Sequence, residues 1–333
     1  MQQQRLLSLD GLRGLAALLV VIYHYFFRID EIYGISSNHM DWSYLGEYGV
    51  HLFFIISGFV IFMSINKNTK SISFFISRFS RLYPTFFFAV IITFTLVYIF
   101  GLEGREVNLI DALLNLLMIH EYLRVPHVDG VYWTLTIEIT FYFWCFLLIL
   151  LNKIHYLKFV LFVFLSISIA NEIIPNPYYE ILNKLFFSNY VGFFLLGVLT
   201  FSLNENKSFI KNSMLITLVF IFLFLDHSFE EFIIFLVLYG LFLIGVYDSS
   251  KILRSRFLVF LGEISYSLYL IHQNIGYIII TKAHELGFSK ISGILSAFIV
   301  SIILARLLYI FIELRLSKFI KISLNKKIKE IRG

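Results

Sequence analysis

Residues 9–27, LDGLRGLAALLVVIYHYFF, form an apolar stretch about long enough to cross a bilayer, and ionisable side chains interrupt it. Arg13 and His24 lie eleven residues apart, which brings them to nearly the same face of an α-helix. Asp10 and Ala17 fall on that face as well. A charge at membrane depth is costly and usually faces a bundle interior or a water-filled cavity. This face is therefore predicted to line a functional site.

The composition indicates a membrane protein. Of the 333 residues, 59% are hydrophobic and only 15% are charged, against about one quarter in soluble domains. The mean hydropathy is +0.83, and there are 39 phenylalanines. The net charge of +5 is modest and its basic residues flank apolar stretches, which indicates membrane orientation and no nucleic-acid partner. The one cysteine, Cys145, lies in an apolar run and is predicted to be buried and inert.

The predicted fold is all-α, with ten transmembrane helices. Ten apolar stretches approach the length that crosses the hydrocarbon core. They are residues 8–28, 45–65, 79–100, 133–151, 157–174, 187–203, 210–226, 230–248, 258–281 and 291–313. A further apolar run at 109–119 is too short to span and is predicted to be an interfacial or re-entrant helix.

Charge asymmetry supports an even number of spans. With ten spans, nineteen of the 27 Lys and Arg residues fall on the side that carries both termini, against six in the opposite loops. By the positive-inside rule, both termini are predicted to be cytoplasmic. Residues 1–315 are then one transmembrane domain, and residues 316–333 form a basic cytoplasmic tail that is expected to lie on the anionic inner leaflet.

His24 and Glu138 are predicted to lie at similar depth near the outer surface. His24 is about one turn from the outer end of the first span, and Glu138 follows the start of the fourth span at Trp133 by five residues. His51, at the outer start of the second span, lies at comparable depth. A carboxylate beside an imidazole can fix its tautomer and make it a working base. Alternatively, Glu138 is a structural polar group that bonds to a neighbouring hydroxyl or to the backbone.

Two further regions contain candidate site residues. Arg78 and Arg81 lie three residues apart on one side of a helical turn, as a phosphate-binding pair would, although they also fit inner-flank residues that only orient the chain. The stretch 261–273, LGEISYSLYLIHQ, contains Tyr266 and His272, which fit either a ligand site or interhelical packing. No histidine pair shows metal-ligand spacing with acidic partners, so no metal site is predicted.

Five stretches together resemble the acyltransferase-3 family of integral membrane O-acyltransferases. They occur in the order of the family and run from residue 9 to residue 272. They are LDGLRGLAALLVVIYH (9–24), GVHLFFIISGFVIF (49–62), RFSRLYP (78–84), WTLTIEITFYFW (133–144) and ISYSLYLIH (264–272).

The resemblance implies a ten-span enzyme that takes an acyl group, usually acetyl, from cytoplasmic acyl-coenzyme A such as acetyl-CoA. The acceptor would be a sugar hydroxyl of a surface glycan or of its lipid-linked precursor. By matching position, His24 would be the catalytic histidine and Arg13 its motif partner along the route of the donor. Arg78 and Arg81 would bind the coenzyme A phosphates, and Glu138 would be the functional acid of the fourth span.

The same resemblance implies a multi-pass protein of the inner (plasma) membrane, with acyl-CoA, a glycan and membrane lipids as partners. The expected supporting residues are Asp10, His51, Trp133, Tyr266 and His272. His51 is a departure from the family, because many relatives have an acid at this position. Two other classes fit the buried charges: a proton-coupled transporter, and a structural partner in glycan export.

Overall fold

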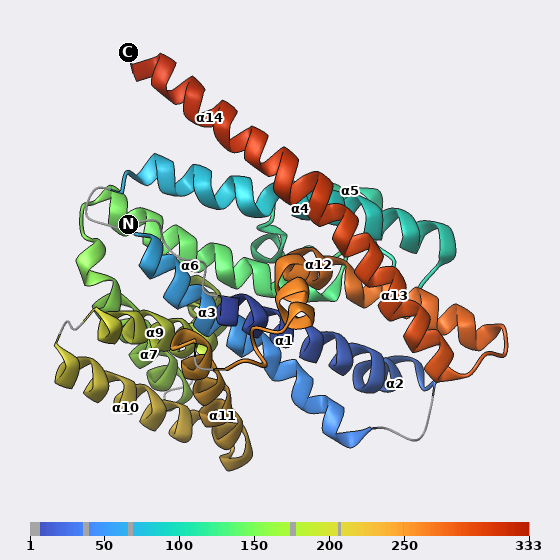
Figure 1. The fold of residues 1–333 in the computed structure, drawn as a ribbon, viewed down its shortest axis with the longest axis horizontal. Coiled ribbons are helices and arrows are strands. Elements are labelled where there is room, and N and C mark those ends of the chain that lie inside the picture. The colour runs from blue at the N-terminus through green and yellow to red at the C-terminus, as the bar shows by residue number, and fades with distance from the viewer. Residues whose placement is uncertain are drawn as a thin grey trace. The chain divides into compact units, whose positions relative to one another are not determined.

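The computed structural model describes residues 7–35, 40–65, 69–173, 178–205, 208–248 and 250–332. Throughout these ranges the regular elements are helices, with no strand (Figure 1). The main helices are α1 (Leu7–Ile22), α2 (Ile29–Tyr33), α3 (Gly49–Ser64), α4 (Ser71–Phe100), α5 (Leu109–Asn115), α6 (Trp133–Leu150), α7 (Leu157–Ile173), α8 (Tyr179–Phe186), α9 (Ser188–Asn204), α10 (Phe209–Asp226), α11 (Phe229–Val246), α12 (Arg256–Glu285), α13 (Lys290–Leu308) and α14 (Ser317–Arg332).

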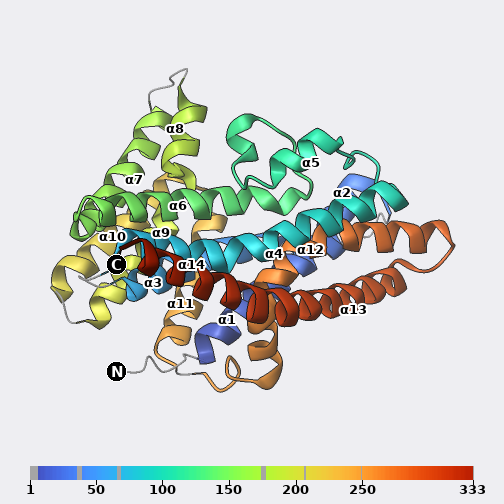
Figure 2. The same ribbon diagram turned by 90° about the horizontal axis from the view of Figure 1, so that it is seen from above.

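Short 3₁₀ and π segments connect these helices. The 3₁₀ segments are η2 (Asp41–Tyr48), η3 (His120–Leu123), η4 (Gly130–Tyr132) and η5 (Ile154–Tyr156). The π-helical segments are η1 (Tyr23–Arg28), between α1 and α2, and η6 (Tyr309–Leu316), between α13 and α14. Figure 2 shows that α13, η6 and α14 form one continuous helical path to the C-terminal end.

Eight helical segments in the described part of the chain are long and apolar enough to cross a membrane. The multi-pass all-α fold is therefore confirmed, whereas the count of ten stays a prediction. All ten predicted ranges are largely helical where they are described. Two of the ten predicted spans are not among these eight. One is α7, which is short, with an apolar stretch of Ile154–Ala170. The other is α12, which has 30 residues but contains many buried polar side chains.

Contacts divide the chain into two compact units. The first unit contains residues 1–12, 50–74 and 137–254, and the second contains residues 13–49, 75–136 and 255–333. In the first unit, α9 packs against both α7 and α10. In the second unit, α12 and α13 lie side by side over much of their length (Figure 2).

The core of the second unit contains buried apolar side chains and a close approach between helix backbones. A Cβ added at Gly14 of α1 would lie 2.1 Å from the carbonyl oxygen of Leu258 on α12, so only glycine permits this approach. Small residues at such crossings let helices pack closely in membranes. Lys290, at the start of α13, forms an ion pair with the buried Asp30 of α2. These contacts hold the N-terminal helix, which carries Arg13 and His24, against α12 and α13.

Candidate active site

His24 lies in the π-helical segment η1 and is only 8% exposed. Segments of this kind are rare and occur frequently at functional sites. The prediction that Asp10, Arg13 and His24 share one face assumed a regular α-helix of 3.6 residues per turn. That geometry holds only up to Ile22, where α1 ends. His24 is nonetheless buried within the second unit. This was expected, because an ionisable side chain is costly in contact with lipid and usually faces the interior of a helix bundle.

His24 contacts a second histidine from α12. The Nδ1 atom of His24 lies 2.8 Å from the carbonyl oxygen of Val20 and 3.3 Å from Nε2 of His272. The two rings meet edge to face, with their centroids 4.9 Å apart. His272 is fully buried, and its Nδ1 atom lies 2.9 Å from the carbonyl oxygen of Tyr269.

These contacts assign the tautomers of both rings. The carbonyl groups of Leu268 and Tyr269 can only accept, so Nδ1 of His272 carries the proton and Nε2 of the neutral ring is an acceptor. His24 faces two acceptors through Nδ1, the oxygen of Val20 and Nε2 of His272, so its Nδ1 carries the proton as well. The basic lone pair of His24 is therefore on Nε2. A neutral imidazole held in this way can accept a proton from a hydroxyl group.

The hydroxyl of Tyr25 binds the backbone of His272. It donates to the carbonyl oxygen of His272 at 2.8 Å and pairs with Ser301 of α13 at the same distance. Tyr25 is fully buried, and its ring fits against α12 at Gly276. A Cβ at Gly276 would lie 2.2 Å from Cε1 of Tyr25. One phenol therefore ties the helix of His24 to α12 and α13.

Gly276→Ala is expected to lower the stability of the protein by about 1–3 kcal/mol, because overpacking a dense core displaces side chains or backbone. The thermal unfolding temperature of the detergent-purified protein measures this loss. Gly240→Ala is the matched control, since no atom lies within 4 Å of its added Cβ. An equal unfolding temperature for both variants would contradict the tight fit of Tyr25 on α12.

A second polar cluster in the same unit contains two of the predicted donor-binding arginines. Arg13 of α1 and Arg81 of α4 both act electrostatically on the carboxylate of Glu313 in η6. Ser267 of α12 donates a hydrogen bond to that carboxylate. Two guanidinium charges from separate helices therefore lie within electrostatic range of one carboxylate, as they would of the phosphate or carboxylate of a ligand.

Arg78 and Arg81 lie well inside α4, because this helix begins eight residues before the predicted start of the span at residue 79. Arg78 is half-buried, and its Nη2 donates to Ser77 at 3.1 Å, whereas Arg81 is exposed. The hydroxyl of Tyr266 donates to the carbonyl oxygen of Leu82 at 2.9 Å. This bond joins α12 to α4 one residue after Arg81.

The remaining predicted residues have other surroundings. In the first unit, the carboxylate of Glu138 accepts hydrogen bonds from Ser57, at 3.1 Å, and from Tyr142, which fits the structural alternative for this residue. The ring of His51 packs among aromatic rings, with centroids 4.6 Å from Phe193 and 5.2 Å from Phe235. That Glu138 orients His24 stays a prediction, because the two residues belong to different units.

The two other supporting residues lie at the starts of helices. Asp10 is half-buried in the first turn of α1 and belongs to the first unit. Trp133, also half-buried, is the first residue of α6 and belongs to the second unit. Their roles at a substrate stay predictions.

The loop before α6 is anchored on α12 two residues after His272. The buried carboxylate of Asp129 accepts from the backbone N–H groups of Asn274, at 3.1 Å, and of Val131, at 3.2 Å. Burial raises the pKa of Asp129 to about 7, although these two donors and the charge of Arg105 act in the opposite direction. The loop is therefore fixed beside the histidine pair.

Comparison with known proteins identifies the family. The family described as an acyltransferase domain, acyltransferase-3, matches residues 6–310, which is most of the chain. The chain belongs to the acyltransferase-3 family. No solved structure matches it significantly.

Three relatives are named as acyl-group or acetyl-group transferases. The ORF330 protein of Acidianus two-tailed virus, whose name proposes an acetyltransferase, is 26% identical over 278 residues, 78% of this chain and 80% of its own length. Acyltransferase MdmB of Streptomyces mycarofaciens is 34% identical over 150 residues, 41% of this chain and 38% of its own. Peptidoglycan O-acetyltransferase OatA of Listeria monocytogenes is 25% identical over 186 residues, 50% of this chain and 28% of its own.

As a member of the acyltransferase-3 family with several apolar helices, the chain is a multi-pass membrane acyltransferase. The predicted enzyme class is thereby confirmed in preference to the transporter and the structural partner. The roles of the predicted site residues in this acyltransferase stay predictions.

Sequence reasoning missed several groups of the site. Arg105 and Gln273 lie beside the histidine pair, and both looked like ordinary loop and helix residues because their partners are distant in sequence. His120 and His127 were not paired by spacing, yet Nε2 of His120 lies 2.7 Å from Nδ1 of His127. Glu313 was not missed, because it is one of the six charged residues within or at the margins of the predicted spans, where the sequence places candidate chemistry.

Proposed function

We propose that this acyltransferase moves an acyl group, most simply acetyl, from acyl-CoA to a hydroxyl of a surface glycan or of its lipid-linked precursor. The location proposed is a bacterial inner membrane. The observation that carries the proposal is the pair of His24 and His272, which leaves the lone pair of Nε2 on His24 available as a base. The names of the relatives support acetyl as the group, and that of OatA supports a glycan as the acceptor.

In the proposed reaction, Nε2 of His24 removes the proton of the acceptor hydroxyl as the oxygen attacks the thioester carbonyl carbon. Collapse of the tetrahedral intermediate breaks the carbon–sulfur bond, and the proton returns from His24 to the departing sulfur as free coenzyme A forms. Val20 and His272 accept from Nδ1–H throughout, so they stabilise the imidazolium that forms between the two steps.

The donor site proposed here consists of Arg13, Arg78 and Arg81. The charges of Arg13 and Arg81 both reach the carboxylate of Glu313, which supports an anion-binding role for them. Arg13 and His24 are separated by about 16 Å along the helix axis, at roughly 1.5 Å per residue. The extended pantetheine arm of coenzyme A would follow this path from the arginines toward the imidazole.

Transfer by purified protein in vesicles tests the proposed function. Acetyl-CoA labelled in its acetyl group is added with a peptidoglycan-derived saccharide, and label in the saccharide is measured after its separation from coenzyme A. We expect saccharide-bound label that depends on the protein. Label that stays in acetyl-CoA, across a panel of neutral and acidic saccharides, would contradict an acyl-CoA-to-glycan transfer.

The double variant Arg78→Gln with Arg81→Gln is expected to raise the KM for acyl-CoA about 10–100-fold, because each substitution exchanges a hydrogen bond to a charged group, worth roughly 1.5–3 kcal/mol, for a neutral one worth roughly 0.5–1.5 kcal/mol. The effect should shrink at high salt, which already screens the wild-type attraction. Lys153→Gln with Lys158→Gln removes the same charge elsewhere in the chain and is the control. Unchanged coenzyme A affinity in the arginine variant would mean that Arg78 and Arg81 only orient the chain in the membrane.

A further inference from the structure

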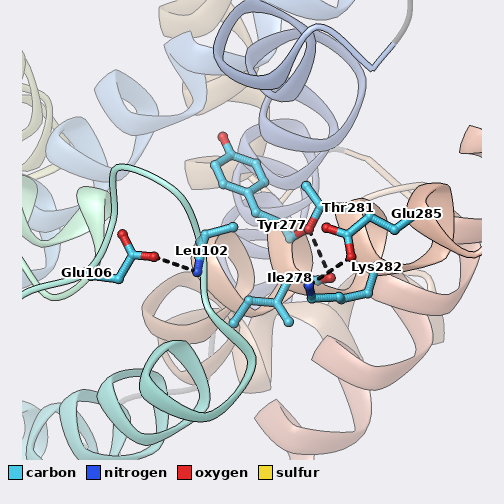
Figure 3. A network of polar contacts seen from close by, with 7 residues as sticks. All are labelled: Leu102, Glu106, Tyr277, Ile278, Thr281, Lys282 and Glu285. Carbon is cyan, nitrogen blue, oxygen red and sulfur yellow. Dashed lines mark hydrogen bonds and ion pairs between the residues drawn. The ribbon is translucent and has the colours of Figure 1, made fainter.

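A glycine-containing turn after α4 places Arg105 beside the histidine pair. Gly101 and Gly104 have φ of +70° and +71°, a left-handed conformation that favours glycine. The N–H of Arg105 donates to the carbonyl oxygen of Leu102 at 2.9 Å, and the N–H of Leu102 donates to Oε1 of Glu106 at 3.1 Å (Figure 3). The turn is thus closed by its own hydrogen bonds, and Arg105 projects from it half-buried.

Gln273 of α12 meets Arg105 at Gly130. A Cβ added at Gly130 would lie 2.6 Å from Oε1 of Gln273 and 3.0 Å from Nη1 of Arg105. Gln273 directly follows His272 and is 4% exposed. Its Nε2 donates to the hydroxyl of Tyr277 at 3.4 Å. Amide and guanidinium groups therefore both pack against the bare backbone of Gly130, in the volume that a side chain at this position would fill.

The amide oxygen of Gln273 is a buried acceptor without a donor in the described part of the chain. Buried polar atoms are nearly always hydrogen-bonded, so an orphaned one indicates an expected partner. Arg105 is similar: its charge reaches His24, Tyr277 and Asp129, and it bonds to the hydroxyl of Tyr33. No carboxylate among the described residues forms an ion pair with it.

Aromatic rings complete the surroundings of His24. Its ring centroid lies 4.9 Å from that of Tyr23 and 6.3 Å from that of Tyr277. Tyr277 in turn packs edge to face on Tyr33 at 5.8 Å. Figure 3 shows the ring of Tyr277 projecting from α12 away from the ion pair of Lys282 and Glu285. Tyr277 is fully buried, so it fixes the positions of Gln273 and of the His24 ring from within the core.

We propose that Arg105 and Gln273 form the acceptor subsite, and that the acceptor is a sugar with an anionic group. Oε1 of Gln273 accepts from a sugar hydroxyl, Arg105 binds the carboxylate or phosphate of the glycan, and the buried Tyr277 holds the amide of Gln273 through its hydroxyl. This subsite rests on the proposed function, because it places the reacting hydroxyl beside Nε2 of His24. Its chemistry selects acidic over neutral glycans.

Saccharide binding to the purified full chain tests the subsite without any acyl donor. The probes are a glucose oligomer, a glucuronate oligomer of equal length, and the glucose oligomer with a terminal phosphate. We expect the wild-type protein to bind at least one acidic probe about tenfold more tightly than the neutral one, since hydrogen bonds to charged groups are the strong ones. The stronger of the two acidic probes identifies carboxylate or phosphate as the anion.

Two variants separate the contributions of the subsite. Arg105→Gln should abolish the preference for acidic probes and leave the neutral oligomer within about twofold of wild type. Gly130→Ala should weaken all probes several-fold, because its methyl group displaces the flexible ends of both Gln273 and Arg105. Gly240→Ala, with open space at its Cβ, is the control for both.

Coenzyme A binding to the same samples keeps the outcomes distinct. Retained coenzyme A affinity shows that a variant is folded and that its donor site is intact. No wild-type preference among the probes, no wild-type binding of any probe, or a preference that survives in Arg105→Gln would each overturn the acceptor subsite. Absent coenzyme A binding in wild type would instead overturn the donor of the proposed function and leave the saccharide result standing.

Discussion

Replacing His24 with alanine is expected to lower kcat for acyl transfer about 10²–10⁴-fold, the usual contribution of a positioned acid–base group. The reason is the assigned tautomer, in which Nε2 of His24 is the lone pair that can take the proton of the acceptor hydroxyl. Alanine removes that lone pair and leaves Arg13 and Arg81 unchanged. The KM for acyl-CoA should therefore stay within a few-fold of wild type.

The measurement is transfer of labelled acetyl at saturating donor, with variants adjusted to equal amounts of folded protein in the membrane. His155→Ala is the control, because His155 lies in the 3₁₀ segment η5 and packs on the neighbouring Tyr156. A fall in kcat for His24→Ala with an unchanged His155→Ala supports the base. Transfer at the wild-type rate in His24→Ala would remove His24 from the chemistry.

Hydropathy predicted where the helices lie, but it could not predict every boundary or the count of spans. The start of α4 at Ser71 was missed because Arg78 looked like a flank residue, although Ser71–Arg78 contains no helix-breaking residue. α12 was predicted as a span from the apolar stretch at residues 258–281, but it is more polar than the other spans. Its His272, Gln273 and Asn274 are buried against neighbouring segments, so its polarity reflects tertiary contacts that hydropathy does not measure.

The candidate site was predictable where a charge interrupts an apolar stretch. Arg13 and His24 met that criterion, and so did Glu313, which lies near Arg13 in the structure. The partner of His24 did not, because His272 is 248 residues away and its spacing fits packing equally well. Arg105 gave no signal at all, since an arginine in a polar loop is ordinary until the fold brings it to Gly130.

His272 is a positioning residue, and two nearly isosteric substitutions distinguish this role from packing. The side-chain amide of glutamine can place an acceptor near the position of Nε2, where His24 donates. Asparagine instead places its amide near the position of Nδ1, where it can donate to Leu268 and Tyr269 but offers His24 no acceptor. We expect His272→Asn to lower kcat roughly 10–100-fold and His272→Gln to stay within a few-fold of wild type, because an oriented donor–acceptor pair sets the tautomer of a catalytic histidine.

The kcat and KM values of both variants, together with their unfolding temperatures, decide between the two roles. If His272 orients His24, the loss in His272→Asn falls on kcat, while the KM for acyl-CoA and the unfolding temperature of the two variants stay similar. A residue that only fills space would give equal losses in both, because the two amides fill much of the same volume. Val20 still accepts from Nδ1 of His24 in His272→Asn, so the loss should remain smaller than that of His24→Ala. Equal kcat values in the asparagine and glutamine variants would therefore mean that Val20 alone sets the tautomer of His24 and that His272 is a packing residue.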